Sequence, residues 1–186
     1  MDAFAHCLEA FSSPHYHPMS QGIALEGMRL VKENLTVVYD DPANLTGRAH
    51  MMSAAMMGAT AFQKGLGAIH ALSHPIGAIY HTHHGTTNAV VMQAVMRFNR
   101  SEIEDRFVSA ARYLDIEGGF DGFYDFVGGL VTHLNIPKNL TDLGLQDLGN
   151  ADFDRIVSAA LNDPSAGGNP RALTAKNTRA LLEACF

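Results

Sequence analysis

Apolar residues recur at intervals of three and four positions over most of this 186-residue chain, which is the spacing of one face of an α-helix. Alternation of β-branched residues, the pattern of a half-buried strand, is nearly absent, and residues 35–39 are the only short candidate for a strand. The pattern therefore predicts an all-α fold. No internal repeat or low-complexity linker interrupts it, so we expect one helical domain over residues 1–186.

Capping residues indicate where several helices begin and end. Asp41-Pro42 places a carboxylate before a proline, which predicts a helix from Ala43 to Phe62 that ends near Gly65. Thr174 can cap a last helix that runs to the C-terminus. Ser101 and Glu104 have the spacing of a capping box, and this helix would end at Gly118-Gly119.

Composition excludes several kinds of partner. The net charge is -6, from 19 acidic and 13 basic residues, and the basic residues form no cluster. We therefore expect no binding to nucleic acid or to an anionic membrane surface. The chain has two cysteines, Cys7 and Cys185, at its opposite ends and no signal peptide, so we expect a cytoplasmic protein with free thiols.

Half of the histidines lie in one uncharged segment. Residues 65–96 contain no Asp, Glu, Lys or Arg, yet they hold five of the ten histidines, which are His70, His74, His81, His83 and His84. A segment so poor in charge is typical of a protein interior, and buried imidazoles need partners. The segment is therefore the expected place for metal coordination or proton transfer.

Spacing brings particular side chains to one side of a helix. Asp2 and His6 are four residues apart, and so are His70 and His74, so each pair could hold a single ion. One carboxylate with three imidazoles, His84 among them, would complete a set of three nitrogens and one oxygen and leave a histidine free for proton transfer. Such a set is typical of a catalytic metal. Spacing alone makes both His70 and His74 candidate ligands.

A proline predicts a break within the segment. Pro75 disfavours the helical conformation at His74, so we expect the helix to be interrupted there. His84 would then enter the site from a loop, and residues 86–88 would cap a helix over Ala89–Phe98.

Segments of the chain closely resemble the C-terminal domain of the iron-containing (group III) alcohol dehydrogenases. They are MDAFAH (1–6), GAIHALSHPIG (67–77) and His84-Gly85, in this order, and the tail Asn169-Pro170-Arg171 with Thr174 is similar to the end of that domain. The resemblance implies a multi-helix domain, in agreement with the periodicity. It also implies reversible oxidation of a small alcohol to an aldehyde or ketone, with hydride transfer to NAD or NADP.

The resemblance also implies roles for individual residues. Asp2, His6, His70 and His84 occupy the metal-ligand positions, for Fe2+ or alternatively Zn2+. His74 matches a histidine between the metal and the nicotinamide, which implies a catalytic role in cofactor positioning or proton relay. Two further histidines depart from the family pattern: His83 offers an alternative ligand beside His84, and His81 is expected at the pocket rim or on the surface.

Members of that family carry an N-terminal nucleotide-binding domain, and we expect that domain to be absent from this chain. The glycine pairs at 118–119, 128–129 and 167–168 lack a preceding strand and fit caps and turns better than a phosphate-binding loop. We therefore expect a homo-oligomer or a separate nucleotide-binding domain as partner. The alternatives are a truncated, inactive metal-binding or interaction module, or a helical core with fortuitous histidines.

Overall fold

The structure is a computed structural model that describes all residues 1–186, and it contains helices but no strand. The prediction of an all-α fold is confirmed. The helices are α1 (Asp2–Ser12), α2 (Pro18–Asp40), α3 (Leu45–Ala61), α4 (Ala68–Tyr80), α5 (His84–Tyr113), α6 (Gly119–His133), α7 (Asn150–Leu161) and α8 (Ala175–Glu183), with short 3-10 helices η1 (Phe62–Lys64) and η2 (Pro164–Gly168).

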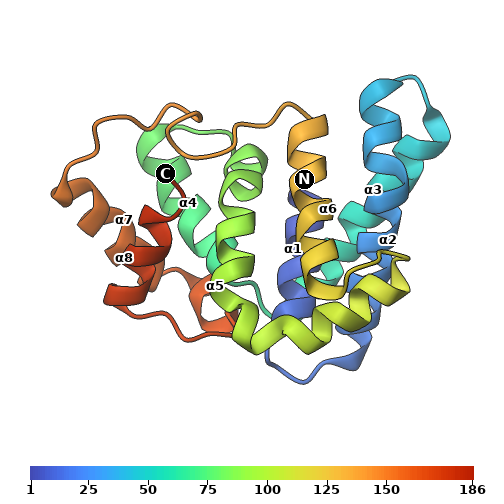
Figure 1. The fold of residues 1–186 in the computed structure, drawn as a ribbon, viewed down its shortest axis with the longest axis horizontal. Coiled ribbons are helices and arrows are strands. Elements are labelled where there is room, and N and C mark those ends of the chain that lie inside the picture. Colours follow the sequence, from blue (N-terminus) through green and yellow to red (C-terminus); the bar gives the residue numbers. More distant parts are fainter.

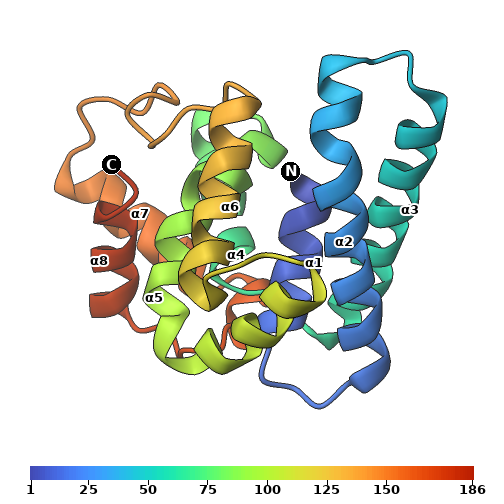
Figure 2. The same ribbon diagram turned by 45° about the vertical axis from the view of Figure 1, so that its right-hand side comes forward.

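Helix α1 is the central element of the fold. It packs against α2 and α3 on one side and against α5 on the other, and Figure 2 shows it between these two groups of helices. Most of its residues are buried, including Phe4, Leu8 and Phe11. Helices α7 and α8 pack together at the opposite end of the molecule from α2 and α3 (Figure 1). The N-terminal helix is therefore held in place by neighbours on two sides.

Glycines allow the close approach of α2 and α3 to α1. A Cβ atom at Gly27 would lie 2.5 Å from Cys7 Sγ, and one at Gly58 would lie 2.9 Å from the Cβ of His6. Neither distance is compatible with a side chain, so glycine permits the packing that fixes α1. Cys7 is fully buried in this contact, as expected for a residue that fills the core, and Cys185 is also free. Burial raises the pKa of both thiols to about 12.

Two predicted features before α3 are wrong. Residues 35–39 belong to α2 and not to a strand, since α2 continues to Asp40. Helix α3 begins at Leu45 instead of Ala43, because Asn44 Oδ1 accepts the hydrogen bond from Gly47 N at 2.8 Å, while Asp41 only closes a turn with Ala43 N. The predicted end near Gly65 is confirmed: η1 continues α3, and Gly65 has a φ of 122°.

Helix α5 replaces two predicted helices. It runs without a break from His84 to Tyr113, so the boundaries at Ala89 and Phe98 are wrong. The predicted capping box is also wrong, because Ser101 lies inside the helix and bonds Glu102, while Glu104 pairs with Arg100. Figures 1 and 2 both show α5 changing direction partway along its length. The capping signal therefore lies inside one continuous helix.

The structure confirms one further predicted helix boundary and contradicts two others. The Thr174 cap is confirmed, since its Oγ1 accepts from Asn177 N. Pro75, however, does not interrupt α4. Leu72 and Ile76 on either side of it are fully buried, and their packing outweighs the local preference of the residue before proline. The prediction that Gly118-Gly119 ends a helix is wrong, because α5 ends at Tyr113 and Gly118, with a φ of 86°, directly precedes α6.

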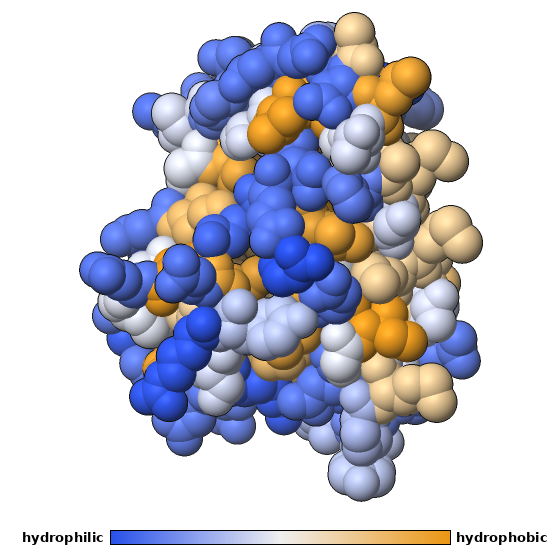
Figure 3. Space-filling view, turned by 90° about the vertical axis from the view of Figure 1, so that its right-hand side faces the viewer, coloured by the Kyte–Doolittle hydropathy of each residue, from blue (hydrophilic) through white to orange (hydrophobic).

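The far side of α3 remains exposed and partly apolar. Leu45, Met52 and Met56 are each at least 70% exposed, and Figure 3, which faces the α2 and α3 side, shows apolar surface among the polar groups. The length and residue content of the helices also exclude a membrane-spanning segment among them.

Candidate metal centre

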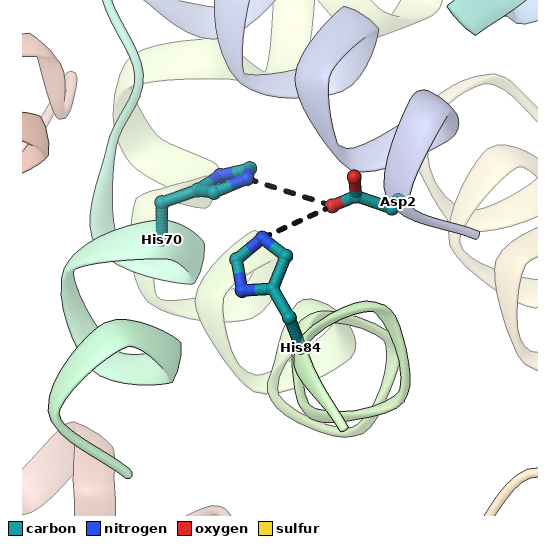
Figure 4. Close-up of side chains that lie close together, drawn as sticks. All are labelled: Asp2, His70 and His84. Carbon is teal, nitrogen blue, oxygen red and sulfur yellow. Dashed lines mark ion pairs between the residues drawn. The ribbon is translucent and has the colours of Figure 1, made fainter. Parts of the chain in front are cut away.

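Three helices bring one carboxylate and two imidazoles together. Asp2 Oδ1 of α1 lies 3.7 Å from Nε2 of His70 on α4 and 3.3 Å from Nε2 of His84, the first residue of α5 (Figure 4). The three donor atoms all lie within 4.8 Å of one another. His84 therefore reaches the cluster from a helix and not from a loop, which corrects the expectation from the sequence.

His70 is the buried member of this cluster, with 1% of its side chain exposed. Its Nδ1 lies 2.6 Å from Glu9 Oε2, while Glu9 Oε1 accepts from Ile69 N, also at 2.6 Å. A carboxylate only accepts hydrogen bonds, so His70 Nδ1 is the donor and Nε2 faces the cluster. Glu9 thus fixes both the start of α4 and the orientation of the imidazole.

The electrostatics favour positive charge at the centre. Burial opposes a charged ring, but hydrogen bonds to Asp2 and Glu9 raise the pKa of His70 to about 9. The hydrogen bond with His70 in turn holds the pKa of Asp2 well below its usual range, despite burial. Burial lowers the pKa of His84. Ionised Asp2 and a neutral His84 are forms that can bind a cation, and His70 becomes a ligand when its Nε2 loses its hydrogen.

The contacts of Asn88 indicate that a positively charged group fits between the donor atoms of Asp2, His70 and His84. Its amide Nδ2 donates to Asp2 Oδ1 at 2.7 Å and also lies 3.2 Å from His70 Nε2 and 3.1 Å from His84 Nε2. Its Oδ1 is buried without a hydrogen-bond partner. Three donor atoms thus converge on a group with partial positive charge, which is the arrangement that a divalent cation requires.

His6 lies at the edge of the cluster and outside the tight group of three. Its ring stacks on His70 with 4.7 Å between centroids, and its Nδ1 is 3.8 Å from Asp2 Oδ2. Burial lowers the pKa of His6, so the neutral form is favoured. The structure therefore brings three of the four expected ligands together and places the fourth beside them.

His74 lies next to the cluster without joining it. Its ring is nearly parallel to that of His84, at 5.4 Å between centroids, and 5.6 Å from that of His70. Its Nδ1 is 2.8 Å from Asp163 Oδ2, so its nitrogens are not among the converging donors. Spacing alone had made His74 a candidate ligand, and the structure gives it a different partner.

The expectation that this segment buries its imidazoles is wrong for four of the five. Only His70 is buried, whereas His74, His81, His83 and His84 are exposed. His81 ends α4 with a φ of 57°, which agrees with a place at the surface. His83 caps α5, since its Nδ1 accepts from Thr86 N. Most apolar residues of the segment are buried, as its lack of charge predicts, whereas these four histidines lie where the segment reaches the surface.

Sequence reasoning missed three residues that organise the site. Glu9 follows Asp2 by seven positions and His6 by three, so helical spacing could have placed it on the same face. Asn88 was assigned only to helix capping. Asp163 follows His74 by 89 positions, and no local pattern links the two.

Comparison with known proteins identifies relatives of the whole chain. Residues 1–186 match the family described as "Fe-containing alcohol dehydrogenase family, C-terminal". The chain is 38% identical to 4-hydroxybutyrate dehydrogenase of Cupriavidus necator, over 98% of this chain and 49% of that protein. It is 30% identical to 1,3-propanediol dehydrogenase of Citrobacter freundii, over 100% of this chain and 49% of that protein.

Solved structures show the same similarity in three dimensions. A crystal structure of 1,3-propanediol oxidoreductase superposes with a TM-score of 0.92 at 29% identity, covering all of this chain and 50% of the other. Alcohol dehydrogenase from Oenococcus oeni gives the same TM-score at 25% identity, again over all of this chain and 50% of the other. The chain thus spans about half the length of the relatives that it matches.

Proposed function

Because this chain belongs to the Fe-containing alcohol dehydrogenase family, we propose that residues 1–186 form the catalytic metal domain of an NAD(P)-dependent alcohol dehydrogenase. The observation that carries this proposal is the convergence of Asp2, His70 and His84, from three helices, on one point. Nitrogen and oxygen donors without cysteine are typical of catalytic and not structural metal sites.

We propose Asp2, His6, His70 and His84 as the ligands. His6 stacks on His70 beside the group of three, with its Nδ1 3.8 Å from Asp2 Oδ2, and this position supports it as the fourth donor. The family indicates Fe2+, and Zn2+ suits the same donors. A bound divalent ion supplies Lewis acidity, which lowers the pKa of an alcohol hydroxyl placed against it.

The residues of the chain support this chemistry by holding the donors and leaving one side open. Glu9 orients His70 from the interior, and Asn88 holds the Asp2 carboxylate. On the other side, the side chains of Asp2 and His84 are 41% and 44% exposed, which leaves access for a substrate. We assign His74, at this open edge, to cofactor positioning or proton relay.

The chain itself offers no dinucleotide-binding turn, because such a turn joins a strand to a helix and the structure has no strand. We therefore propose that NAD or NADP is bound mainly by a separate nucleotide-binding domain, in the same longer protein or in a partner. The hydride of the alcohol carbon would pass to its nicotinamide. Homo-oligomerisation is a further proposal, which the exposed apolar residues of α3 support.

The substrate that we propose is a short primary alcohol with a second polar group. Two relatives are named for 4-hydroxybutyrate and 1,3-propanediol, which share a terminal hydroxyl and a polar group at the other end. The buried free thiols Cys7 and Cys185 support a reducing, cytoplasmic location.

Metal titration tests the ligand set directly. Calorimetry and absorption spectroscopy with Co2+ should show one site in the wild-type chain, and His70→Ala should lower the affinity by more than about 100-fold, beyond the loss of a supporting residue. His133→Ala is the matched control, since His133 pairs with Asp40 on the surface. Equal affinity of wild type and His70→Ala contradicts the site.

Activity separates the enzyme from a non-catalytic metal-binding module. Alcohol-dependent reduction of NAD and NADP should occur in a protein extended by its nucleotide-binding domain and should be lost on His70→Ala. Metal binding without such reduction in the extended protein would support the module.

A further inference from the structure

A carboxylate from a distant part of the chain holds His74. Asp163 lies immediately before η2, which packs against α4, and its Oδ2 is 2.8 Å from His74 Nδ1. The Asp163 side chain is only 11% exposed, whereas that of His74 is 43% exposed. The pair therefore connects a fixed carboxylate to an accessible imidazole at the edge of the metal centre.

The orientation of this carboxylate is set by its second oxygen. Asp163 Oδ1 accepts a hydrogen bond from Ser165 N at 2.8 Å and caps η2. Although burial opposes ionisation, the hydrogen bonds from Ser165 and His74 lower the pKa of Asp163. One oxygen is thus occupied by the backbone, and only the other is available to His74.

This arrangement determines which nitrogen of His74 carries the hydrogen. An ionised carboxylate has no hydrogen to donate, so Nδ1 must be the donor. The neutral ring then has its lone pair on Nε2, which bonds no other residue of the chain. The rings of His70 and His84 lie within 5.6 Å, between centroids, of the His74 ring.

We propose that Asp163 is a positioning residue that fixes His74 in its Nδ1-H tautomer and so keeps Nε2 a hydrogen-bond acceptor at the open edge of the metal centre. On the proposed function, on which the meaning of this assignment rests, that acceptor would receive the hydroxyl hydrogen of a bound alcohol.

Nuclear magnetic resonance can read the tautomer directly. In protein labelled with 15N at histidine, long-range 1H-15N spectra distinguish the Nδ1-H and Nε2-H forms of each ring. Metal-free and Zn2+-loaded wild type should both show His74 as Nδ1-H. In Asp163→Asn the carbonyl oxygen stays with Ser165 N, so the amide NH2 faces His74 Nδ1, and the ring should switch to Nε2-H.

Asp40→Asn is the matched control, because Asp40 contacts His133 Nε2 at 2.9 Å on the surface. It should change the spectrum of His133 and leave that of His74 unchanged. Asp163→Ser keeps a capping oxygen for η2 but removes the partner of His74, so it should give a mixture of tautomers in a folded protein.

Wild-type His74 in the Nε2-H form, or an unchanged tautomer in Asp163→Asn, would overturn the proposal. A second measurement separates it from the ligand assignment: Zn2+ affinity should be unchanged, within about 2-fold, in Asp163→Asn. A fall of 10-fold or more, in the range of a residue that supports a ligand, would make Asp163 part of the metal site instead. Failure of the wild type to bind Zn2+ would defeat the proposed ligand set but not the tautomer assignment.

Discussion

The two ends of helix α1 differ in how their polar groups find hydrogen-bond partners. At its C-terminal end, Nη1 of Arg106 donates to the carbonyl oxygens of Phe11, Ser12 and Ser13 at 2.6 to 2.9 Å. Lys64 Nζ adds a bond to Phe11 O at 3.2 Å. The last carbonyls of a helix lack partners within the helix, and here two cations from other elements satisfy them.

At the N-terminal end, the polar groups outnumber their partners. No side chain caps the helix there, and Asp2, His70 and His84 share the single amide nitrogen of Asn88. The end that Arg106 and Lys64 cap holds α1 in place, while the other end gathers donor atoms on which a cation can bind. Rigid support at one end of a helix and unmet coordination at the other is the division that a binding site requires.

The largest expected effect is on the supporting end. Arg106→Ala removes the bonds to three carbonyl oxygens and should lower the free energy of unfolding by about 3 kcal/mol, since bonds to charged groups contribute more than neutral ones. Urea unfolding measures this loss, and Arg112→Ala, an exposed arginine of α5, should change it by less than about 0.5 kcal/mol. Unchanged stability in Arg106→Ala would remove the contrast between the two ends.

Glu9 lies between the two ends, and Glu9→Gln tests whether it serves the site. The glutamine carbonyl can still accept from Ile69 N, but its NH2 would face His70 Nδ1 and move the ring hydrogen to Nε2. Affinity for Co2+ should fall by about 10 to 100-fold. The control is Glu33→Gln, at an exposed partner of Arg29, which should bind Co2+ with the affinity of the wild type. If Glu9 only supports the fold, Glu9→Gln would also bind Co2+ with unchanged affinity.

Asn88→Ala tests the open end itself. Without the hydrogen bond from Nδ2, the Asp2 carboxylate is less well oriented, and Co2+ affinity should fall by about 10-fold. The control is Asn99→Ala on the same helix, where a buried amide bonds Asn169 instead. This control should lower stability without changing the affinity of the folded protein for Co2+. If calorimetry shows that Asn99→Ala weakens Co2+ binding and Asn88→Ala does not, the role of Asn88 in the site is refuted.

The smallest effect concerns pH at the supporting end. Burial, with a smaller contribution from Arg106, lowers the pKa of Lys64 from 10.5 to about 8. Between these values the unfolded chain binds more protons than the folded protein, so the free energy of unfolding should rise with pH from 8 to 10.5. Compared with Lys64→Met, the wild type should gain on the order of 1 kcal/mol over this range, measured by urea unfolding. A parallel pH dependence in both proteins would contradict this.

The fold class could be predicted from the sequence because periodicity is a local property that packing preserves. Local signals failed where packing decided. Pro75 and Ser101 both suggested boundaries, yet α4 and α5 continue through them. Asp41 was the predicted cap of α3, yet the structure places Asn44 in that position.

The candidate site divides in the same way. Asp2, His70 and His84 could be nominated from helical spacing together with a family resemblance, and the structure brings these three together. Asp163 could not, because its contact with His74 depends on how α4 packs against η2. Glu9 shares a helical face with Asp2 and His6, but only the fold brings Ile69 and His70 of α4 to it. The sequence also could not tell that the uncharged segment borders an open surface, since apolar neighbours accompany both buried and rim histidines.

Helix α5 reaches both ends of α1, with Asn88 near its start and Arg106 nearer its end (Figure 1). Both contacts can form only if the number of residues between Asn88 and Arg106 stays the same. One residue inserted between them would rotate Arg106 by about 100° and advance it by about 1.5 Å, away from the carbonyls that it caps. Length variation among relatives should avoid this interval and collect in connections such as residues 134–149, which have no regular helix.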